Sequence, residues 1–178
     1  MTADPQGEPL DLPPEYGTPS QVLTWPEVRT RLEAAPHYWL ATTCPDGRPH
    51  AVPVDGLWLD DACWFGGSLE AVKHRNLRAD GRASLHLPDA EAAVMVEGFC
   101  DLDRPDKDAA ARLVRASKAK YGYAPPPSAY TNGVWRLRPR KVMAWSALPS
   151  DATRFHFPLT AGQGRNSVDD VDRGNRRS

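Results

Sequence analysis

The chain has 178 residues, the size of one domain, and its 22 basic and 23 acidic side chains nearly cancel to a formal net charge of −1. This balance argues against nucleic acid or an anionic membrane as a partner, and no apolar run approaches the roughly 20 residues that span a bilayer. Three scattered cysteines without a CxxC pair exclude a disulfide framework and a zinc site, so we expect a reduced, cytoplasmic protein without a metal.

Residues 1–20 are rich in proline and poor in large apolar side chains, which predicts an extended N-terminal arm. A helix is predicted to begin after Thr24, because Thr24 and Glu27 have the spacing of a capping box. Pro26 falls in the first turn of this helix, where a missing amide proton costs no hydrogen bond. Apolar residues then repeat on one helical face, and Pro36 ends the helix.

Five segments are rich in β-branched and aromatic residues or alternate in polarity, which predicts strands. They cover residues 38–43, 49–59, 63–65, 82–87 and 92–103. Turn residues, Pro45 to Gly47 and then Asp60-Asp61, separate the first three and give two consecutive hairpins. A helix is predicted over residues 69–79, between the third strand and the fourth.

The second half of the chain begins with a helix of about 15 residues from Pro105, followed by a proline-rich loop. Residues 134–146 are predicted to form a last hairpin, and residues 153–157 a short closing strand. Residues 159–178 offer few side chains for burial and predict a disordered tail. We therefore expect one domain over residues 21–158, in which six or seven antiparallel strands close into a barrel or sandwich.

The stretch WFGGS (64–68) ends a strand in two glycines and a hydroxyl, directly before a basic helix. Glycines let the backbone approach a ligand closely, and a helix N-terminus favours phosphate. Lys73 is long enough to reach back to that N-terminus, while Arg75 and Asn76 add donors on adjacent faces. We interpret this stretch as a phosphate-binding cradle; the alternative is a capped surface helix with a solvated basic face.

Four stretches carry a resemblance to a known family through their order and spacing. They are LATTCPDGRPHAVPV (40–54), KHRNLRADGRASLHL (73–87), VMVEGFCDL (94–102) and WRLRPRKVMAW (135–145). Together they resemble the pyridoxamine 5'-phosphate oxidase-like superfamily, the FMN-binding split barrels. The resemblance implies a fold that is mainly β with short helices, an antiparallel split β-barrel, and a homodimer with two shared cofactor sites.

The resemblance also implies FMN as the cofactor, with the deazaflavin coenzyme F420 as the alternative. His50, Val52 and Pro53 would line the flavin ring, and the segment 65–68 together with Lys73 would hold its phosphate. Two C-terminal tryptophans are expected to wall the site from the partner subunit. The candidate cofactor-binding residues are thus His50, Val52, Pro53, Phe65, Gly66, Gly67, Ser68, Lys73, Arg75, Asn76, Trp135 and Trp145.

The function expected from these features is an oxidoreductase that passes a hydride between the cofactor and a small organic substrate. The alternatives are a non-catalytic flavin- or tetrapyrrole-binding module and a purely structural interaction domain. Asp55 stands where pyridoxamine phosphate oxidases carry a lysine, so pyridoxamine phosphate is not the expected substrate. The five histidines lack metal-ligand spacing, and all except His50 are interpreted as structural or solvent-facing. No residue is nominated as a catalytic acid or base.

Overall fold

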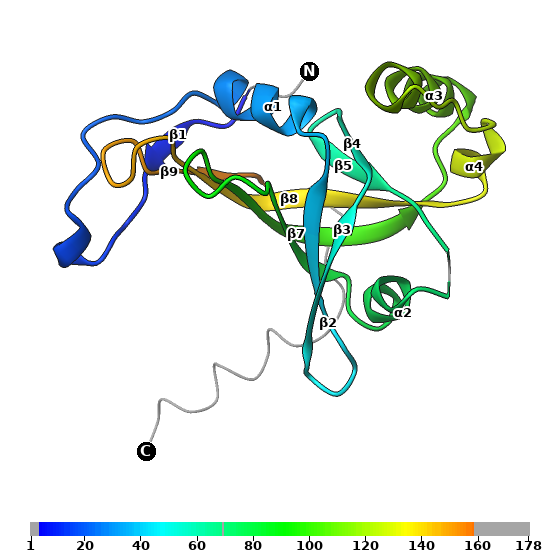
Figure 1. Cartoon of the computed structure of the whole chain (residues 1–178), viewed down its shortest axis with the longest axis horizontal. Coiled ribbons are helices and arrows are strands. Elements are labelled where there is room, and N and C mark those ends of the chain that lie inside the picture. The colour runs from blue at the N-terminus through cyan, green and yellow to red at the C-terminus, as the bar shows by residue number, and fades with distance from the viewer. Residues whose placement is uncertain (1–3, 69, 159–178) are drawn as a thin grey trace.

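The computed structural model describes residues 4–68 and 70–158 (Figure 1), so the disordered tail predicted over 159–178 lies outside the described residues. The helices are η1 (Pro14–Tyr16), α1 (Trp25–Ala34), α2 (Val72–Ala79), α3 (Lys107–Tyr121) and α4 (Ser128–Thr131). The strands are β1 (Gly7–Pro9), β2 (Tyr38–Thr43), β3 (Pro49–Val54), β4 (Gly56–Leu59), β5 (Ala62–Phe65), β6 (Arg82–His86), β7 (Val94–Asp103), β8 (Val134–Ala144) and β9 (Thr153–His156). No helix among these is long and apolar enough to cross a membrane.

The described strands form one antiparallel sheet in the order β1-β9-β8-β7-β6-β2-β3, to which β4 and β5 are added through β8. The long strands β7 and β8 pair along their whole length and cross the molecule in Figure 1. The other edge of β8 is divided, because its first half pairs with β5 and its second half with β9. The predicted mainly β, antiparallel architecture with short helices is therefore confirmed.

Helix α1 closes one side of the barrel, with Trp25 as its main contact. The Trp25 ring lies edge-on to the rings of Trp58 and Phe155, at centroid distances of 6.3 and 5.4 Å. The predicted helix start is confirmed, since the backbone N–H of Thr24 donates to Glu27 Oε2 at 2.7 Å in a capping box. Burial of this aromatic cluster fixes α1 on the sheet.

The last predicted hairpin is wrong, because residues 134–144 form the single strand β8. Pro139 and Arg140 resemble a turn in the sequence, but they lie where β8 changes neighbours from β5 to β9. The register between β7 and β8 shifts between Glu97 and Gly98, which pair with Lys141 and Pro139, so that Arg140 of β8 is the extra residue of a β-bulge. A bulge is one of the few places where a proline is tolerated inside a long strand.

Gly98→Ala is expected to lower the free energy of unfolding by about 2 kcal/mol, through overpacking at the bulge. A Cβ at Gly98 would lie 2.1 Å from the backbone oxygen of Arg138, so the paired strand would have to move. Chemical denaturation measures the change. Gly66→Ala is the matched control, since a Cβ there meets no atom within 4 Å. Equal stability of both variants would contradict this account of the bulge.

The N-terminal residues run against the far end of the sheet from α2 (Figure 1). Strand β1 pairs with β9, and the backbone N–H of Leu10 donates to the carbonyl of Ala152 at 2.8 Å. These backbone hydrogen bonds attach an otherwise polar, extended segment to the domain.

Candidate functional site

Helix α2 is attached to the barrel by one buried amide. Asn76 is 1% exposed, and its Nδ2 donates to Thr42 Oγ1 on β2 at 3.0 Å and to Cys44 Sγ at 3.6 Å. Leu77 beside it belongs to the hydrophobic core. Asn76 was predicted as a cofactor donor, but the structure uses its amide to position α2, so the N-terminus of the helix faces the end of β5.

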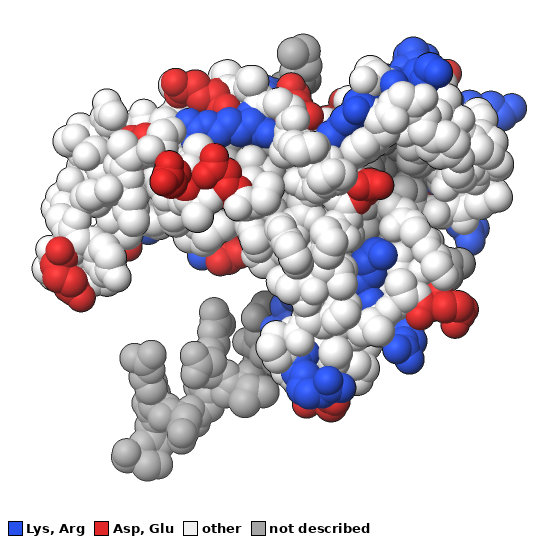
Figure 2. Space-filling model, in the orientation of Figure 1, with Lys and Arg blue, Asp and Glu red and all other residues white. Residues whose placement is uncertain are grey.

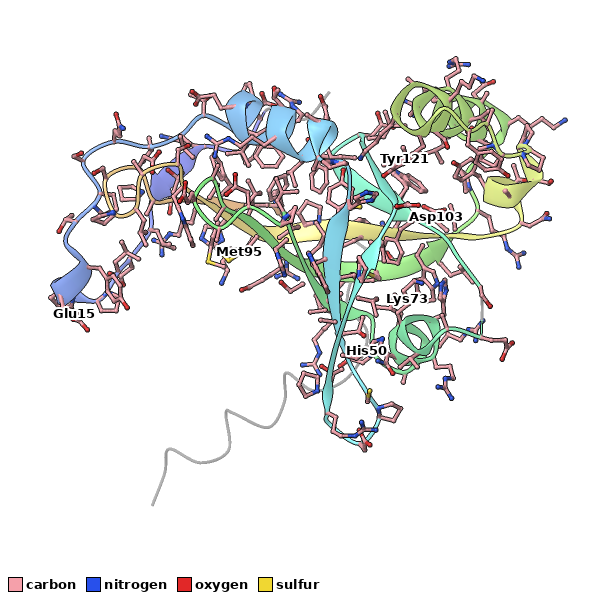
Figure 3. The ribbon with its side chains drawn as sticks, viewed as in Figure 1. Glu15, His50, Lys73, Met95, Asp103 and Tyr121 are labelled. Atoms are coloured by element: carbon pink, nitrogen blue, oxygen red, sulfur yellow. The ribbon has the colours of Figure 1, made fainter. Side chains whose placement is uncertain are left out.

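Of the two glycines after β5, Gly67 is the one whose backbone lies close to side chains of α2. Gly67 has φ of +124°, a conformation that side-chain-bearing residues rarely adopt. A Cβ at Gly67 would lie 3.2 Å from Lys73 Nζ and 3.5 Å from His74 Nε2. The Lys73 ammonium and the His74 imidazole therefore converge over the backbone of Gly67, which carries no side chain. Figure 3 labels Lys73 on α2.

His74, which the sequence predicts to be structural or solvent-facing, is part of this group. It is 1% exposed, and its Nδ1 accepts a hydrogen bond from Trp135 Nε1 at 2.6 Å. Its Nε2 is buried and has no hydrogen-bond partner of ordinary geometry among the described residues. Burial, and then the charges of Lys73 and Arg78, lower the pKa of His74 below its ordinary 6.5, while a weak hydrogen-bond interaction of the ring with the Gly66 backbone acts in the opposite direction. The ring is therefore neutral near pH 7.

Other residues predicted for the cradle lie in different environments. Phe65 is 2% exposed and packs in the core, so only its backbone can line a site. Ser68 is exposed and does not cap α2, because the helix begins at Val72 with Ala71 as its N-cap. The predicted start of this helix at residue 69 is therefore three residues early. Arg75 is exposed on α2.

The two C-terminal tryptophans lie at opposite ends of β8. Trp135 is 4% exposed within its own chain and donates to His74, so its ring packs beside the cradle of its own chain. Trp145 is half-buried beyond the other end of β8, where its Nε1 donates to the carbonyl of Ala90 at 3.3 Å. The two cannot belong to one site within one chain.

The side chains of β3 divide between the two faces of the sheet. His50 and Val52 pair with Thr42 and Leu40, on the face that α2 and the core cover. Pro53 pairs with the exposed Trp39 on the outer face. The side chains of His50, Val52 and Pro53 therefore cannot all face one flavin ring. For all three to line it, the residues on one face of β3 would have to contribute backbone atoms.

The arrangement around Gly67 is suited to an anion. Lys73 supplies a positive charge, His74 a buried ring nitrogen, and Gly67 an exposed backbone that a ligand can approach. The N-cap of α2 has no capping side chain, so its first amides remain available to a ligand. Figure 2 shows basic side chains gathered over and around α2. A terminal phosphate group matches these donors in charge and in its hydrogen-bond acceptors.

Two hollows in the described structure lie away from this cradle. One, of about 690 Å³, is bounded by Trp64, Arg136 and α3. The other, of about 570 Å³, lies on β2, β6 and β7 and includes Thr43, Ser84 and Phe99. Neither is lined by Ser68 or Lys73. The cradle at Gly67 thus lies outside both hollows.

The family model described as pyridoxamine 5'-phosphate oxidase matches residues 24–146, most of the chain. The chain belongs to the pyridoxamine 5'-phosphate oxidase family. The family's sequence match spans every stretch on which the resemblance was recognised. No curated protein matches this chain.

Several solved structures share the fold of this chain. A heme-binding protein from Mycobacterium smegmatis is 28% identical with a TM-score of 0.59, over 73% of this chain and 56% of its own. An F420 reductase is 22% identical with a TM-score of 0.50, over 64% of this chain and 94% of its own. The heme storage protein from Vibrio cholerae is 15% identical with a TM-score of 0.54, over 67% of this chain and 93% of its own. The predicted split barrel is therefore confirmed.

Proposed function

We propose that this member of the pyridoxamine 5'-phosphate oxidase family binds FMN, with coenzyme F420 as the alternative, and transfers a hydride to or from a small organic substrate. The observation that carries the proposal is the convergence of Lys73 Nζ and His74 Nε2 over Gly67. A flavin supplies the hydride chemistry, so the protein needs to bind and orient it. The phosphate anchor of such a cofactor matches the donors that the chain brings together.

The residues of the anchor have separate tasks. Lys73 attracts the phosphate by charge, and the bare backbone of Gly67 lets its oxygens approach. The exposed Ser68 hydroxyl is available as a further donor. Strand β3 pairs with β2, whose Thr42 accepts from Asn76 of α2, and β3 is the surface along which the ring would lie.

Heme binding without turnover is the second candidate. It is favoured by the 28% identity to the M. smegmatis heme-binding protein, of which the matched region spans 56%. A heme needs an axial ligand such as histidine. The half-buried His50 on β3, whose position Figure 3 labels, is the histidine closest to the ring surface proposed above.

Absorbance titration separates these functions. Purified protein would be titrated with FMN, with coenzyme F420 and with heme, and the cofactor with the lowest Kd identified. The proposal expects saturable binding of FMN or F420 and reduction and reoxidation of the bound cofactor on addition of substrates. Tight binding of heme alone, or binding of none of the three, would refute it.

We also propose that two copies of the chain complete each site. The anchor lacks a wall within one chain, and a flavin ring needs enclosure to exclude water. The outer face of β2 and the edge strand β3 carries no charge in the described structure. Its residues are Trp39, Ala41, Thr43, Pro49, Ala51 and Pro53. Such a face, with an exposed tryptophan, suits an interface between copies.

Sedimentation of the purified chain is expected to give twice its mass of 19.6 kDa at micromolar concentration. Trp39→Glu should shift the protein toward monomer and weaken FMN binding, because a charge would be buried at the interface. Tyr123→Glu is the matched control, since Tyr123 is 63% exposed on the connection between α3 and α4. A wild-type monomer that binds FMN tightly would rule out the shared site.

A further inference from the structure

His74 has one ring nitrogen held by the fold and the other directed at the anion cradle. Its Nδ1 accepts from Trp135 Nε1 at 2.6 Å, while Nε2 is buried, unpartnered and 3.5 Å from the Cβ position of Gly67. Lys73 Nζ lies 3.2 Å from the same position. A buried donor without a partner is costly, so its retention needs an explanation.

We infer that His74 binds the phosphate of the cofactor directly, as a neutral Nε2–H donor beside Lys73, and that Trp135 is a positioning residue that fixes this tautomer. The inference rests on the proposed function and deepens it. It assigns the phosphate two different side-chain donors, one charged and one neutral. It also gives the buried Nε2 the partner that it lacks.

The tautomer follows from the chemistry of the two rings. An indole N–H can only donate, so Nδ1 of His74 must accept and the single proton of the neutral ring is on Nε2. Protonation would put a second proton on Nδ1, facing the indole N–H, and break that hydrogen bond. The contact between β8 and α2 therefore keeps the ring neutral and its donor directed at the cradle.

Lys73 and His74 contribute to phosphate binding in different ways. Lys73 is half-buried with a flexible side chain, so it supplies charge without a fixed direction. The imidazole is fixed by burial and by Trp135, so its N–H defines where one phosphate oxygen lies. A ligand with a terminal phosphate satisfies both donors, whereas riboflavin, which lacks the phosphate, satisfies neither.

Nitrogen-15 NMR of the histidine rings tests the tautomer and the contact with inorganic phosphate as the probe. In the wild-type chain we expect His74 as the Nε2–H tautomer at neutral pH, and its Nε2 resonance should move on addition of phosphate. Trp135→Phe should remove the tautomer preference. A ring protonated on Nδ1, or a His74 resonance that phosphate leaves unchanged, would overturn the inference.

Substitution of His74 by asparagine or by glutamine distinguishes its role as a phosphate donor from its bond to Trp135. Asn at position 74 places its amide near Nδ1 and can keep the bond to Trp135, whereas Gln reaches the position of Nε2 and can keep the donor. His74→Asn should weaken FMN binding about tenfold or more and leave riboflavin binding unchanged, while His74→Gln should lose less. Equal FMN affinity of His74→Asn and the wild type would overturn the inference.

The two measurements distinguish failure of this inference from failure of the proposed function. If phosphate moves the His74 resonance but neither FMN nor F420 binds, the cofactor assignment is wrong and the anion-binding role of His74 stands. If FMN binds tightly while His74→Asn binds it equally well, the cofactor assignment stands and the role of His74 is wrong.

Discussion

Lys73→Ala is expected to weaken FMN binding by about 1.5–3 kcal/mol, the range for a hydrogen bond to a charged group. The corresponding loss of affinity is roughly 10- to 150-fold. The reason is local: Lys73 Nζ lies over Gly67, and the near-neutral chain offers no general attraction that could replace its charge. Quenching of flavin fluorescence on titration measures both affinities.

Arg78→Ala is the matched control for this experiment. It removes an equal charge from the same helix, but from an exposed position in its last turn. We expect less than a threefold change in FMN affinity, because an exposed charge at that distance is screened by salt. If the two variants lose affinity equally, binding responds to the net charge of α2, and Lys73 has no specific contact with the phosphate.

Local signals predicted the elements that local chemistry determines. The capping box of Thr24 and Glu27 placed α1, and alternation placed β2 over 38–43. The predictions that were wrong concern elements whose bounds depend on contacts with residues distant in the sequence. Pro139 and Arg140 have the composition of a turn, but pairing with β7 on both sides of Arg140 keeps β8 continuous. Likewise α2 begins after Ala71, since Asn76 must reach Thr42 on β2.

The candidate site shows the same division. Lys73 and Gly67 could be predicted, because the glycines, the helix start and the lysine lie within one short stretch. His74 could not be assigned its contact, because its partner Trp135 is 61 positions away on β8. One signal was present: His74 and Leu77 are three residues apart and share the buried face of α2. That spacing indicated that His74 is buried, but it could not predict the surroundings of its Nε2.

Gly67→Ala is expected to weaken FMN binding by about 2–3 kcal/mol, while the thermal unfolding temperature stays close to that of the wild type. Alanine disfavours the φ of +124° that Gly67 adopts, so the free loop would relax to another conformation and binding would have to restore it. The added Cβ would also displace Lys73 Nζ, which lies 3.2 Å from its position. Gly66→Ala, with no atom within 4 Å of its Cβ, should bind FMN normally.

The double variant Gly67→Ala, Lys73→Ala shows whether the two residues act on one phosphate. If they do, alanine at position 67 removes most of what Lys73 contributes, and the combined loss of binding free energy should fall short of the sum of the single losses. Independent effects would instead add within about 0.5 kcal/mol. Full additivity would mean that the glycine shapes the loop for something other than the Lys73 contact. A large fall in unfolding temperature for Gly67→Ala would mean that this exposed loop supports the fold itself.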